Sequence, residues 1–381
     1  MKNKPLKILF DANPLVNGNK SGVGYYTQGL VQALADNYPT EIELVGHYFS
    51  FLGRKDKIAL PTAQNIRYVR SKLVPGKILS ITRKLGFQLP LELFFKQRGD
   101  VALFTNFVSL PSITNIPIIV AVHDLCFEDV PQYVAEKNRS FLRRFVPRSI
   151  STAKLVITIS ETTKLAIKHR YQTDDNKFVI TPIPPSSPVH TKQTSTSSFG
   201  IKKDYVLFVS TLEPRKNVIN LVKAYEQLSE NIRDTHQLVL AGGQGWYMEE
   251  TLTYIKNLQG NGYGIILAGY VSDVQRAELY TNTKLFVVPS HYEGFGMPIL
   301  EAMSYGVPTA VSDIPVFHEV AENASLYFDK DNPGAIAEAI TTMLDSIEVR
   351  EKYIKLGNER LKNYDWQVVA EKLLSSIKQL R

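Results

Sequence analysis

The sequence predicts an α/β protein made of two doubly wound domains, each with its own parallel sheet. Short apolar runs bounded by Gly, Pro or polar residues alternate with helical patterns along the whole chain, which is typical of repeated βα units. The chain has 381 residues, whereas single hydrophobic cores stop growing at about 250 to 300 residues. Two domains are therefore expected, and each half of the chain supplies strands for one of them.

Ten apolar runs have the length and composition of buried parallel strands. In the first half they cover residues 6–10, 41–45, 101–104, 118–122 and 155–159. In the second half they cover residues 206–209, 238–241, 265–268, 285–288 and 308–311. Ligands of open parallel sheets bind beyond the carboxyl ends of the strands, so the residues that follow these runs are the first candidates for a site.

A stiff turn and a polar tether separate the two halves. Four prolines fall within residues 182–188, and Ser and Thr dominate residues 191–198. Near the end of the chain, Asp365 is a suitable N-cap for a helix whose apolar residues recur every three or four positions. The expected organisation is an N-terminal domain (1–184), a linker (185–204), a C-terminal domain (205–364) and a C-terminal helix (365–381).

The composition excludes several classes of protein. Hydrophobic residues make up 44% of the chain and charged residues 21%, which is typical of a globular protein rather than a disordered one. The single cysteine, Cys126, cannot form an internal disulfide and suits a reducing compartment. No run approaches the roughly 18 apolar residues that a membrane-spanning helix needs. We therefore expect a cytoplasmic protein without a transmembrane helix or a secretory signal.

The net charge of +7 is unevenly distributed. Residues 1–184 carry 25 Lys and Arg against 14 Asp and Glu, and residues 185–381 carry 19 against 23. A basic half is compatible with nucleic acid, an anionic membrane or a phosphorylated substrate, and composition alone does not choose among them. Nucleic acid is disfavoured as a partner because the chain has no dense Lys/Arg run and its second half is acidic.

Two adjacent cations follow the strand expected at 206–209. The segment Glu213-Pro214-Arg215-Lys216-Asn217 leads directly into a helical pattern. Arg215 and Lys216 thus concentrate positive charge near a helix N-terminus, where a phosphate is already favoured. We interpret the pair as a diphosphate clamp, and two solvated surface cations are the alternative. Tyr270 and Val271, which follow a later strand, either line a nucleotide pocket or form a simple turn.

Two glutamates stand eight residues apart near a glycine-rich loop. Glu293 precedes Gly294, Phe295 and Gly296, and Glu301 is expected in the first turn of a helix that Pro298 starts. A loop carboxylate can bind ligand hydroxyls while the glycines keep the wall of the site thin. A helix carboxylate can accept two vicinal hydroxyls of a ribose or sugar. The alternative is that Glu301 only complements the helix dipole and Glu293 is a surface residue of the turn.

The first half contributes a glycine turn and a histidine. Gly22 and Gly24 open a helix after the strand expected at 6–10, in a pattern that is neither a G-x-G-x-x-G fingerprint nor a P-loop. A ligand can come close to the backbone of a glycine because glycine has no side chain, and a helix N-terminus offers free N–H groups to an anion. His123 lies at the carboxyl end of the strand expected at 118–122. A packing turn and a structural histidine are the alternatives.

Taken together, these residues resemble glycosyltransferase family 4, the retaining nucleotide-sugar enzymes of the GT-B fold, over nearly the whole chain. The resemblance rests on the segment from Glu213 to Asn217, on the Glu293/Glu301 pair, and on the Ser-Gly-Val-Gly turn with His123-Asp124. It is strongest to bacterial mannosyl- and rhamnosyltransferases of surface polysaccharide synthesis. It implies two Rossmann-like domains that face a cleft, the first (1–184) binding the acceptor and the second (205–364) binding the nucleotide sugar, and a C-terminal helix that crosses back to the first domain.

The resemblance also implies a role for each candidate residue, with Glu293, His123, Arg215 and Lys216 as the catalytic residues. Arg215 and Lys216 would hold the donor diphosphate, with Gly22 and Gly24 approaching the phosphate from the first domain. Glu301 would bind the ribose hydroxyls, and Tyr270 and Val271 would line the nucleotide pocket. Glu293 and the backbone of Gly294, Phe295 and Gly296 would hold the donor sugar, which His123 would face.

The expected reaction is transfer of a hexose from a nucleotide sugar, with GDP-mannose as the donor we expect, to a glycan or a polyprenyl-diphosphate-linked acceptor. No metal or other cofactor is expected, since no cluster of Asp, Glu and His has the spacing of a Mg²⁺ or Mn²⁺ site. A nucleotide-sugar epimerase on the same fold and a two-carboxylate glycoside hydrolase are alternatives. Basic residues within 67–84 and 137–148 predict peripheral binding to the inner face of the cell membrane, and a solvated basic face is the other interpretation.

Overall fold

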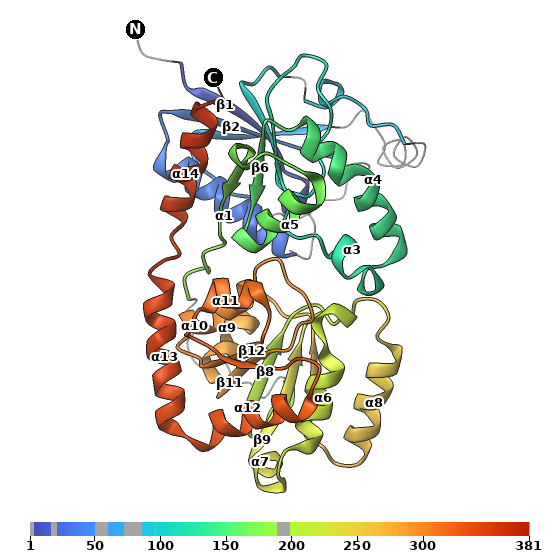
Figure 1. Cartoon of the computed structure of the whole chain (residues 1–381). Coiled ribbons are helices and arrows are strands. Elements are labelled where there is room, and N and C mark those ends of the chain that lie inside the picture. Colours follow the sequence, from blue (N-terminus) through green and yellow to red (C-terminus); the bar gives the residue numbers. More distant parts are fainter. Residues whose placement is uncertain are drawn as a thin grey trace. The chain divides into compact units, whose positions relative to one another are not determined.

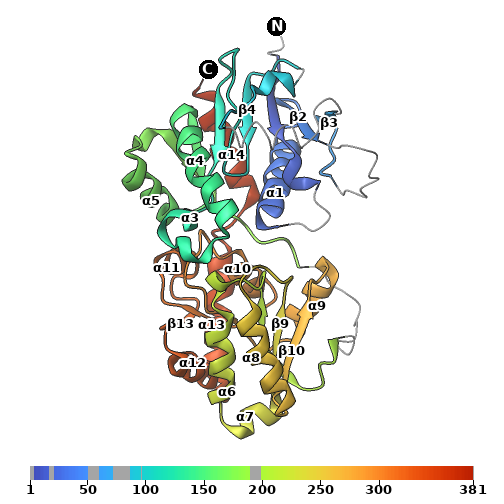
Figure 2. The same ribbon diagram turned by 90° about the vertical axis from the view of Figure 1, so that its right-hand side faces the viewer.

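The computed structural model describes residues 4–16, 21–49, 60–71, 86–95, 97–188 and 199–380. The chain divides into two compact units (Figures 1 and 2). The N-terminal unit comprises Met1–Glu128, Glu136–Ile183 and Asp365–Arg381, and the C-terminal unit comprises Asp129–Ala135 and Pro184–Tyr364. Each unit is built around one parallel sheet, so the predicted α/β class with two doubly wound sheets is confirmed.

The sheet of the N-terminal unit has seven strands in the order β3-β2-β1-β4-β5-β6-β7, and each neighbouring pair is parallel. The strands are β1 (Leu6–Asp11), β2 (Ile42–Phe49), β3 (Ile66–Ser71), β4 (Val101–Phe104), β5 (Ile118–Ala121), β6 (Leu155–Thr158) and β7 (Phe178–Ile180). The order reverses between β1 and β4, and such a switch point is where open sheets bind ligands.

Among the described residues, the helices of the N-terminal unit are α1 (Gly22–Asn37), α4 (Glu136–Thr152), α5 (Glu161–Tyr171) and the C-terminal helix α14 (Trp366–Lys378), with the short helix α3 (Cys126–Asp129) at the border of the unit. Of these, α1, α4 and α5 lie between consecutive strands of the sheet. Three short 3-10 turns, η1 (Asn13–Leu15), η2 (Leu91–Leu93) and η4 (Asp175–Lys177), complete the described part of the unit.

The C-terminal unit repeats the arrangement with six parallel strands in the order β10-β9-β8-β11-β12-β13. The strands are β8 (Asp204–Val209), β9 (His236–Ala241), β10 (Ile265–Gly269), β11 (Leu285–Val288), β12 (Thr309–Ser312) and β13 (Leu326–Phe328). The helices are α6 (Val218–Gln227), α7 (Glu230–Thr235), α8 (Glu249–Gly260), α9 (Asp273–Asn282), α10 (Met297–Ser304), α11 (Pro315–Ala321), α12 (Pro333–Asp345) and α13 (Ile347–Leu361).

Three observed strands, β3, β7 and β13, were not among the predicted runs. All three are edge strands: β3 and β7 close the two sides of the N-terminal sheet, and β13 closes one side of the C-terminal sheet. Their residues are largely half-exposed, whereas β4, β5, β6 and β11 are buried throughout. A strand that is buried on both faces reads as a continuous apolar run. The edge strands β3, β7 and β13 lack such a run, whereas the fourth edge strand, β10, has one at 265–268 and was predicted.

The C-terminal helix α14 belongs to the N-terminal unit and packs on α1. The predicted cap is confirmed, because the Asp365 carboxylate accepts a hydrogen bond from the N–H of Gln367 at 2.7 Å. Gly29 of α1 leaves room for the indole of Trp366, since a Cβ at residue 29 would lie 2.2 Å from that ring. The helix that the resemblance predicted to cross back to the first domain therefore does so.

In the ranges that the structure describes, no helix has both the length and the apolar character needed to cross a bilayer.

Candidate functional site

Two loops of the C-terminal unit bring four charged side chains together. The first follows β8 and contains the 3-10 turn η6 (Pro214–Lys216), and the second follows β11 and leads into α10. Asn217 ends the first loop with a φ of 56°, in the left-handed region, and α6 begins at the next residue. Its side-chain amide donates to the carbonyls of Pro289 (2.9 Å) and Lys330 (2.8 Å). The amide therefore ties the first loop to the second.

The carboxylate of Glu293 lies at the centre of this cluster. Its Oε1 accepts hydrogen bonds from Lys216 Nζ at 2.5 Å and from Ser290 Oγ at 2.8 Å, and its Oε2 accepts one from Arg215 Nη1 at 2.9 Å. Burial alone would raise the pKa of Glu293, but the charges of Lys216 and Arg215, with hydrogen bonds from Lys216 and Ser290, lower that pKa to about 2. Glu293 is therefore an ionised acceptor at neutral pH and not a proton donor.

Arg215 lies between two carboxylates. Its Nη2 and Nε donate to Oε1 of Glu213 at 2.7 and 3.1 Å, while its Nη1 donates to Glu293 and to the carbonyl of Tyr292, both at 2.9 Å. Glu213 is buried, with only 5% of its surface exposed. Sequence reasoning missed Glu213 as a partner of Arg215, although its place two residues earlier in the same turn was a usable signal. The guanidinium is thus fixed from both sides.

Glu301 lies on α10 with partners of its own. Because α10 begins at Met297, Glu301 stands in the second turn and not in the first turn that was predicted. Its Oε1 pairs with Arg276 Nη2 at 3.4 Å, and its Oε2 accepts a hydrogen bond from the Tyr280 hydroxyl at 3.3 Å. Burial raises the pKa of Glu301, while the charge of Arg276 and the bond from Tyr280 act against that rise. Arg276 and Tyr280 had no assigned role in the sequence.

The other predicted residues of the C-terminal unit differ in exposure. Gly296 starts α10 with a φ of 104°, a conformation that favours glycine. Phe295 is buried and its ring packs edge-on against Tyr364, so only the Phe295 backbone is available to a ligand. Tyr270 is 50% exposed, whereas its neighbour Val271 is 7% exposed.

In the N-terminal unit, Gly22 and Gly24 form the first turn of α1. The Ser21 hydroxyl caps this helix by accepting a hydrogen bond from the N–H of Gly24 at 3.4 Å. A Cβ built on Gly22 would have no atom within 4 Å, so the backbone here faces open space. The predicted helix start at these glycines is confirmed, but Gly24 is buried, and residues 17–20, just before the helix, lie outside the described residues.

His123 is buried in neutral surroundings. Its Nε2 lies 2.7 Å from the carbonyl oxygen of Thr105, and because a carbonyl only accepts, Nε2 carries a proton. Burial lowers the pKa of His123, although the bond to Thr105 and the charge of Asp124 oppose the change. The rings of Tyr26 and Phe107 pack edge-on against the imidazole, with centroids 5.1 and 5.3 Å away. A neutral ring protonated at Nε2 leaves Nδ1 as a hydrogen-bond acceptor.

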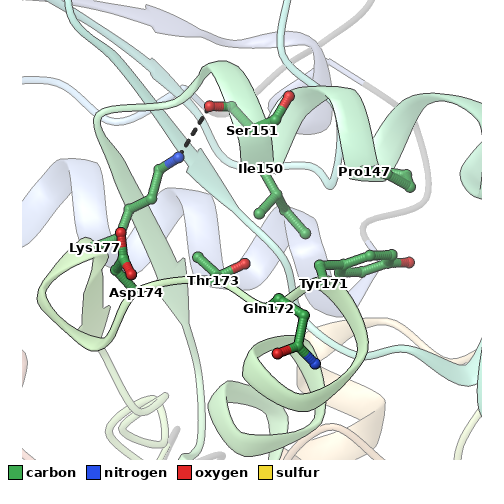
Figure 3. A pocket seen from close by; sticks show the side chains of 8 residues that line it. All are labelled: Pro147, Ile150, Ser151, Tyr171, Gln172, Thr173, Asp174 and Lys177. Atoms are coloured by element: carbon green, nitrogen blue, oxygen red, sulfur yellow. Dashed lines mark hydrogen bonds between the residues drawn. The ribbon is translucent and has the colours of Figure 1, made fainter.

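Two cavities lie away from the predicted residues. One, of about 340 Å³, is enclosed by the last turns of α4 and α5 and the segment up to Lys177, whose ammonium donates to the Ser151 carbonyl at 3.0 Å (Figure 3). The other, of about 370 Å³, is lined by residues that precede or begin β8, β9 and β10. Both lie where strands begin, and none of the predicted site residues lines them.

Within the described ranges, no group of three or more His, Cys, Asp or Glu side chains is placed to hold a metal ion.

Comparison with known proteins gives the relatives of this chain. Residues 191–360 match the family described as glycosyl transferases group 1. O-antigen chain mannosyltransferase B of Escherichia coli is 26% identical, over 98% of this chain and 100% of that protein. O-antigen chain mannosyltransferase RfbU of Salmonella typhimurium is 28% identical, over 91% of this chain and 93% of its own. The structure of HepE of Anabaena, solved in complex with UDP and glucose, superposes with a TM-score of 0.69 at 15% identity, covering 98% of this chain and 99% of that one.

The fold is that of the GT-B glycosyltransferases, with two Rossmann-like parallel sheets and a C-terminal helix on the first of them. The resemblance to glycosyltransferase family 4 is confirmed: residues 191–360 match the group 1 family of glycosyltransferases, and the chain is a glycosyltransferase.

Proposed function

We propose that this protein is a retaining mannosyltransferase that transfers mannose from GDP-mannose to a glycan or polyprenyl-diphosphate-linked acceptor in surface polysaccharide synthesis. The names of two relatives that align over more than nine-tenths of this chain support mannose and O-antigen. The observation that carries the proposal is the cluster in which Arg215 and Lys216 meet Glu293. Two cations and a carboxylate at the carboxyl ends of β8 and β11 fit the diphosphate and the sugar of one donor.

The protonation state of the cluster defines what each side chain can do. Glu293 Oε1 already accepts two hydrogen bonds and Oε2 accepts one, so the ionised carboxylate retains an acceptor position on Oε2 for a hydroxyl of the donor sugar. Lys216 carries three N–H donors and can reach a phosphate oxygen while it stays bonded to Glu293. As the sugar leaves, negative charge develops on the diphosphate, and cations held in place stabilise that charge without rearrangement.

The remaining roles follow from the same assignment. Gly22, which faces open space, would offer the start of α1 to the diphosphate, with the buried Gly24 behind it, and His123 would accept a hydrogen bond from a substrate hydroxyl at Nδ1. Glu301 would bind the ribose, and Tyr270 and Val271 the base. The backbone of Gly294, Phe295 and Gly296 would complete the sugar site. The structural likeness to HepE, whose structure holds UDP and glucose, supports a nucleotide-sugar donor in general. Which base and which sugar the donor of this protein carries needs a direct test.

A panel of nucleotides tests the donor. GDP, UDP, dTDP and their sugars would each be added to the purified protein, and a ligand at a hundred times its dissociation constant should stabilise it by about 2.7 kcal/mol. We expect GDP and GDP-mannose to raise the melting temperature most. Glu293→Gln serves as the control, because it should keep the shift with GDP and lose transfer. Stabilisation by none of these nucleotides would refute the proposal.

Release of free nucleotide separates transfer from the epimerase alternative. A transferase releases GDP only when an acceptor is present, whereas an epimerase changes the sugar while it remains attached or acts without any acceptor. The assay follows GDP with and without a lipid-linked or oligosaccharide acceptor. EDTA is added in parallel, and we expect it to leave the rate unchanged because the cations of the cluster are side chains. A strict requirement for added Mn²⁺ would contradict the assigned leaving-group chemistry.

We also propose that the N-terminal unit docks on an anionic membrane surface, where a lipid-linked acceptor would be found. Three large apolar side chains are exposed there: Phe87 by 70%, Leu93 by 52% and Ile113 by 72%. The N–H of Ile113 donates to Glu92 at 3.1 Å, so the two segments that carry these side chains lie side by side. Arg148 of α4 donates to the carbonyl of Gly86 at 3.3 Å. The apolar group therefore borders the basic face of α4.

The charges of the predicted basic residues, on β3 as well as on α4, are partly neutralised. Arg143 pairs with Glu128 at 3.3 Å, Arg67 pairs with Glu43 at 2.9 Å, and Arg139 pairs with Glu136. Arg144 and Arg148 both lie beside the ring of Phe145. Residues 72–85, which hold Lys72, Lys77, Arg83 and Lys84 of the predicted basic stretch, lie outside the described residues.

Vesicle sedimentation tests the membrane proposal. We expect binding to vesicles with anionic lipid at low salt, weaker binding at high salt, and no binding to zwitterionic vesicles. Arg144→Gln with Arg148→Gln should weaken it by about 2 kcal/mol, because each basic residue near the surface contributes about 1 kcal/mol. Phe87→Ser should weaken it as well, while Leu165→Ser, a matched change at a residue that is 53% exposed on α5, should not. Absence of binding at low salt would favour a solvated basic face.

A further inference from the structure

The carboxylate of Glu301 is held by two side chains of a neighbouring helix. Arg276 and Tyr280 stand one turn apart on α9, and each contacts a different oxygen of Glu301, at 3.4 and 3.3 Å. Glu301 is 5% exposed, so few other orientations of its side chain are open to it. One carboxylate is therefore positioned through both of its oxygens.

Helix α9, whose side chains contact Glu301, is itself anchored in the unit. Ser272 and Gln275 form a capping box at the start of α9, which satisfies backbone groups at that end. The ring of Tyr280 is 1% exposed, stacks on Tyr305 at 5.5 Å and packs edge-on against Phe286 at 5.4 Å. A hydroxyl on a ring packed in this way cannot follow a moving carboxylate. The two contacts thus impose a geometry on Glu301 and do not merely accompany it.

Counting acceptor positions shows what this geometry offers. An ionised carboxylate has about four lone-pair positions, two on each oxygen. Within the described residues, Tyr280 donates one hydrogen bond to Oε2, and Arg276 lies beside Oε1 as an ion pair at 3.4 Å. Each oxygen therefore retains at least one acceptor position. Two hydroxyls on adjacent carbons match that pair, and a ligand with one hydroxyl leaves a buried acceptor without a donor.

We propose that Arg276 and Tyr280 are positioning residues that hold Glu301 for the vicinal hydroxyls of a ribose, and that they make the donor site selective for ribonucleotides over 2′-deoxyribonucleotides. The inference rests on the proposed role of Glu301 in binding the nucleotide. It narrows the donor to a ribonucleoside diphosphate sugar and disfavours donors built on dTDP. It also gives α9 a function in the reaction, which the motifs of the sequence did not assign.

Affinities for matched nucleotide pairs test the inference. The dissociation constants of GDP and 2′-deoxy-GDP are measured for the wild-type protein, with UDP and 2′-deoxy-UDP as a second pair. We expect the ribonucleotide to bind about 10-fold to 100-fold more tightly, because the missing hydroxyl leaves a buried acceptor unpaired. Arg276→Gln and Tyr280→Phe should each reduce this ratio to a few-fold by weakening the ribonucleotide alone. Arg276→Lys, which retains the charge, should recover part of the ratio.

Controls separate a positioning role from a structural one. Arg350 also makes partly buried hydrogen bonds in this unit, to the carbonyls of Met343 and Leu344, so Arg350→Gln should leave the ratio unchanged even if it lowers the melting temperature. In transfer assays, Arg276→Gln should raise the donor KM and leave kcat nearly unchanged.

Different outcomes overturn different statements. If Glu301→Gln abolishes the preference for ribose while Arg276→Gln and Tyr280→Phe retain the full wild-type ratio, the ribose role of Glu301 stands and the positioning role falls. A wild-type protein that binds GDP and 2′-deoxy-GDP equally well also refutes the inference, although the nucleotide site remains. If the wild-type protein binds no nucleotide, the proposed function itself fails.

Discussion

The candidate sites of the two units differ in how they are held. In the C-terminal unit, Glu213, Arg215, Lys216 and Glu293 form a chain of ion pairs at 2.5 to 2.9 Å. In the N-terminal unit, His123 is held by a backbone carbonyl and aromatic edges, and the glycines of α1 contribute only backbone. Under the proposed function, the charged cluster meets the diphosphate and the sugar of the donor through ionised side chains, whereas the N-terminal site meets the same donor through backbone and one neutral imidazole.

The largest expected effect comes from removing a cation of the charged cluster. Arg215→Ala or Lys216→Ala should lower kcat by about 10²-fold to 10³-fold, the loss of about 2.7 to 4 kcal/mol that follows removal of one preorganised donor. Either change should also weaken binding of free GDP. Glu293→Gln should lower kcat strongly while the affinity for GDP stays within a few-fold of wild type. Steady-state rates and calorimetry would show the contrast, and an Arg215→Ala/Lys216→Ala protein with normal GDP affinity would contradict it.

The two sites should also differ in their response to acid. The pKa of Glu293 is lowered from 4.5 to about 2. On acidification Glu293 is therefore protonated in the unfolded chain before it is protonated in the folded protein, and the free energy of unfolding falls as the pH drops from about 4.5 to about 2. The pKa of His123 is lowered from 6.5, so its contribution to stability is full above pH 6.5 and declines below it. Denaturant unfolding against pH, compared with Glu293→Gln and His123→Asn, measures both windows. Equal slopes in a variant and the wild type would contradict the assignment for that residue.

Glycines in the two sites should respond differently to a methyl group. A Cβ at Gly296 would lie 2.7 Å from Phe317 Cε1, in a backbone with a φ of 104°, so Gly296→Ala should destabilise the protein by about 1 to 3 kcal/mol. A Cβ at Gly22 would meet nothing within 4 Å, and Gly22→Ala in a helix should be neutral or stabilising by about 0.4 to 1 kcal/mol. Thermal unfolding tests both. A raised donor KM in Gly22→Ala, without a lower melting temperature, would support the proposed phosphate contact.

The smallest expected effect on turnover is that of His123. One neutral hydrogen bond contributes about 0.5 to 1.5 kcal/mol, so His123→Asn should lower kcat/KM by about tenfold, much less than loss of a cation. Donor affinity should change little. A loss as large as that of Lys216→Ala would show that His123 carries charge during the reaction, and the contrast between the two sites would then no longer hold.

Much of the fold and part of the site could be predicted from residue order alone. Buried strands such as β4 and β11 are continuous apolar runs, and their predicted bounds match the observed ones. Arg215 and Lys216 are adjacent and lie next to a helix start, so their shared location followed from the chain itself. Asp365 could be recognised as a cap because capping depends on residues two or three positions away. Each of these features is local, and local features are encoded within a few residues.

Features that join distant segments were decided only by the tertiary structure. The edge strands β3, β7 and β13 are largely half-exposed, so their place in the sheets leaves little trace in the side-chain pattern. The segment Asp129–Ala135 packs with the C-terminal unit through Tyr133, whose ring stacks on His291 and whose carbonyl accepts the Trp246 indole N–H. Glu301 meets Arg276 and Tyr280 because α9 and α10 lie side by side. Such contacts depend on how whole elements pack, and no short window of sequence contains that information.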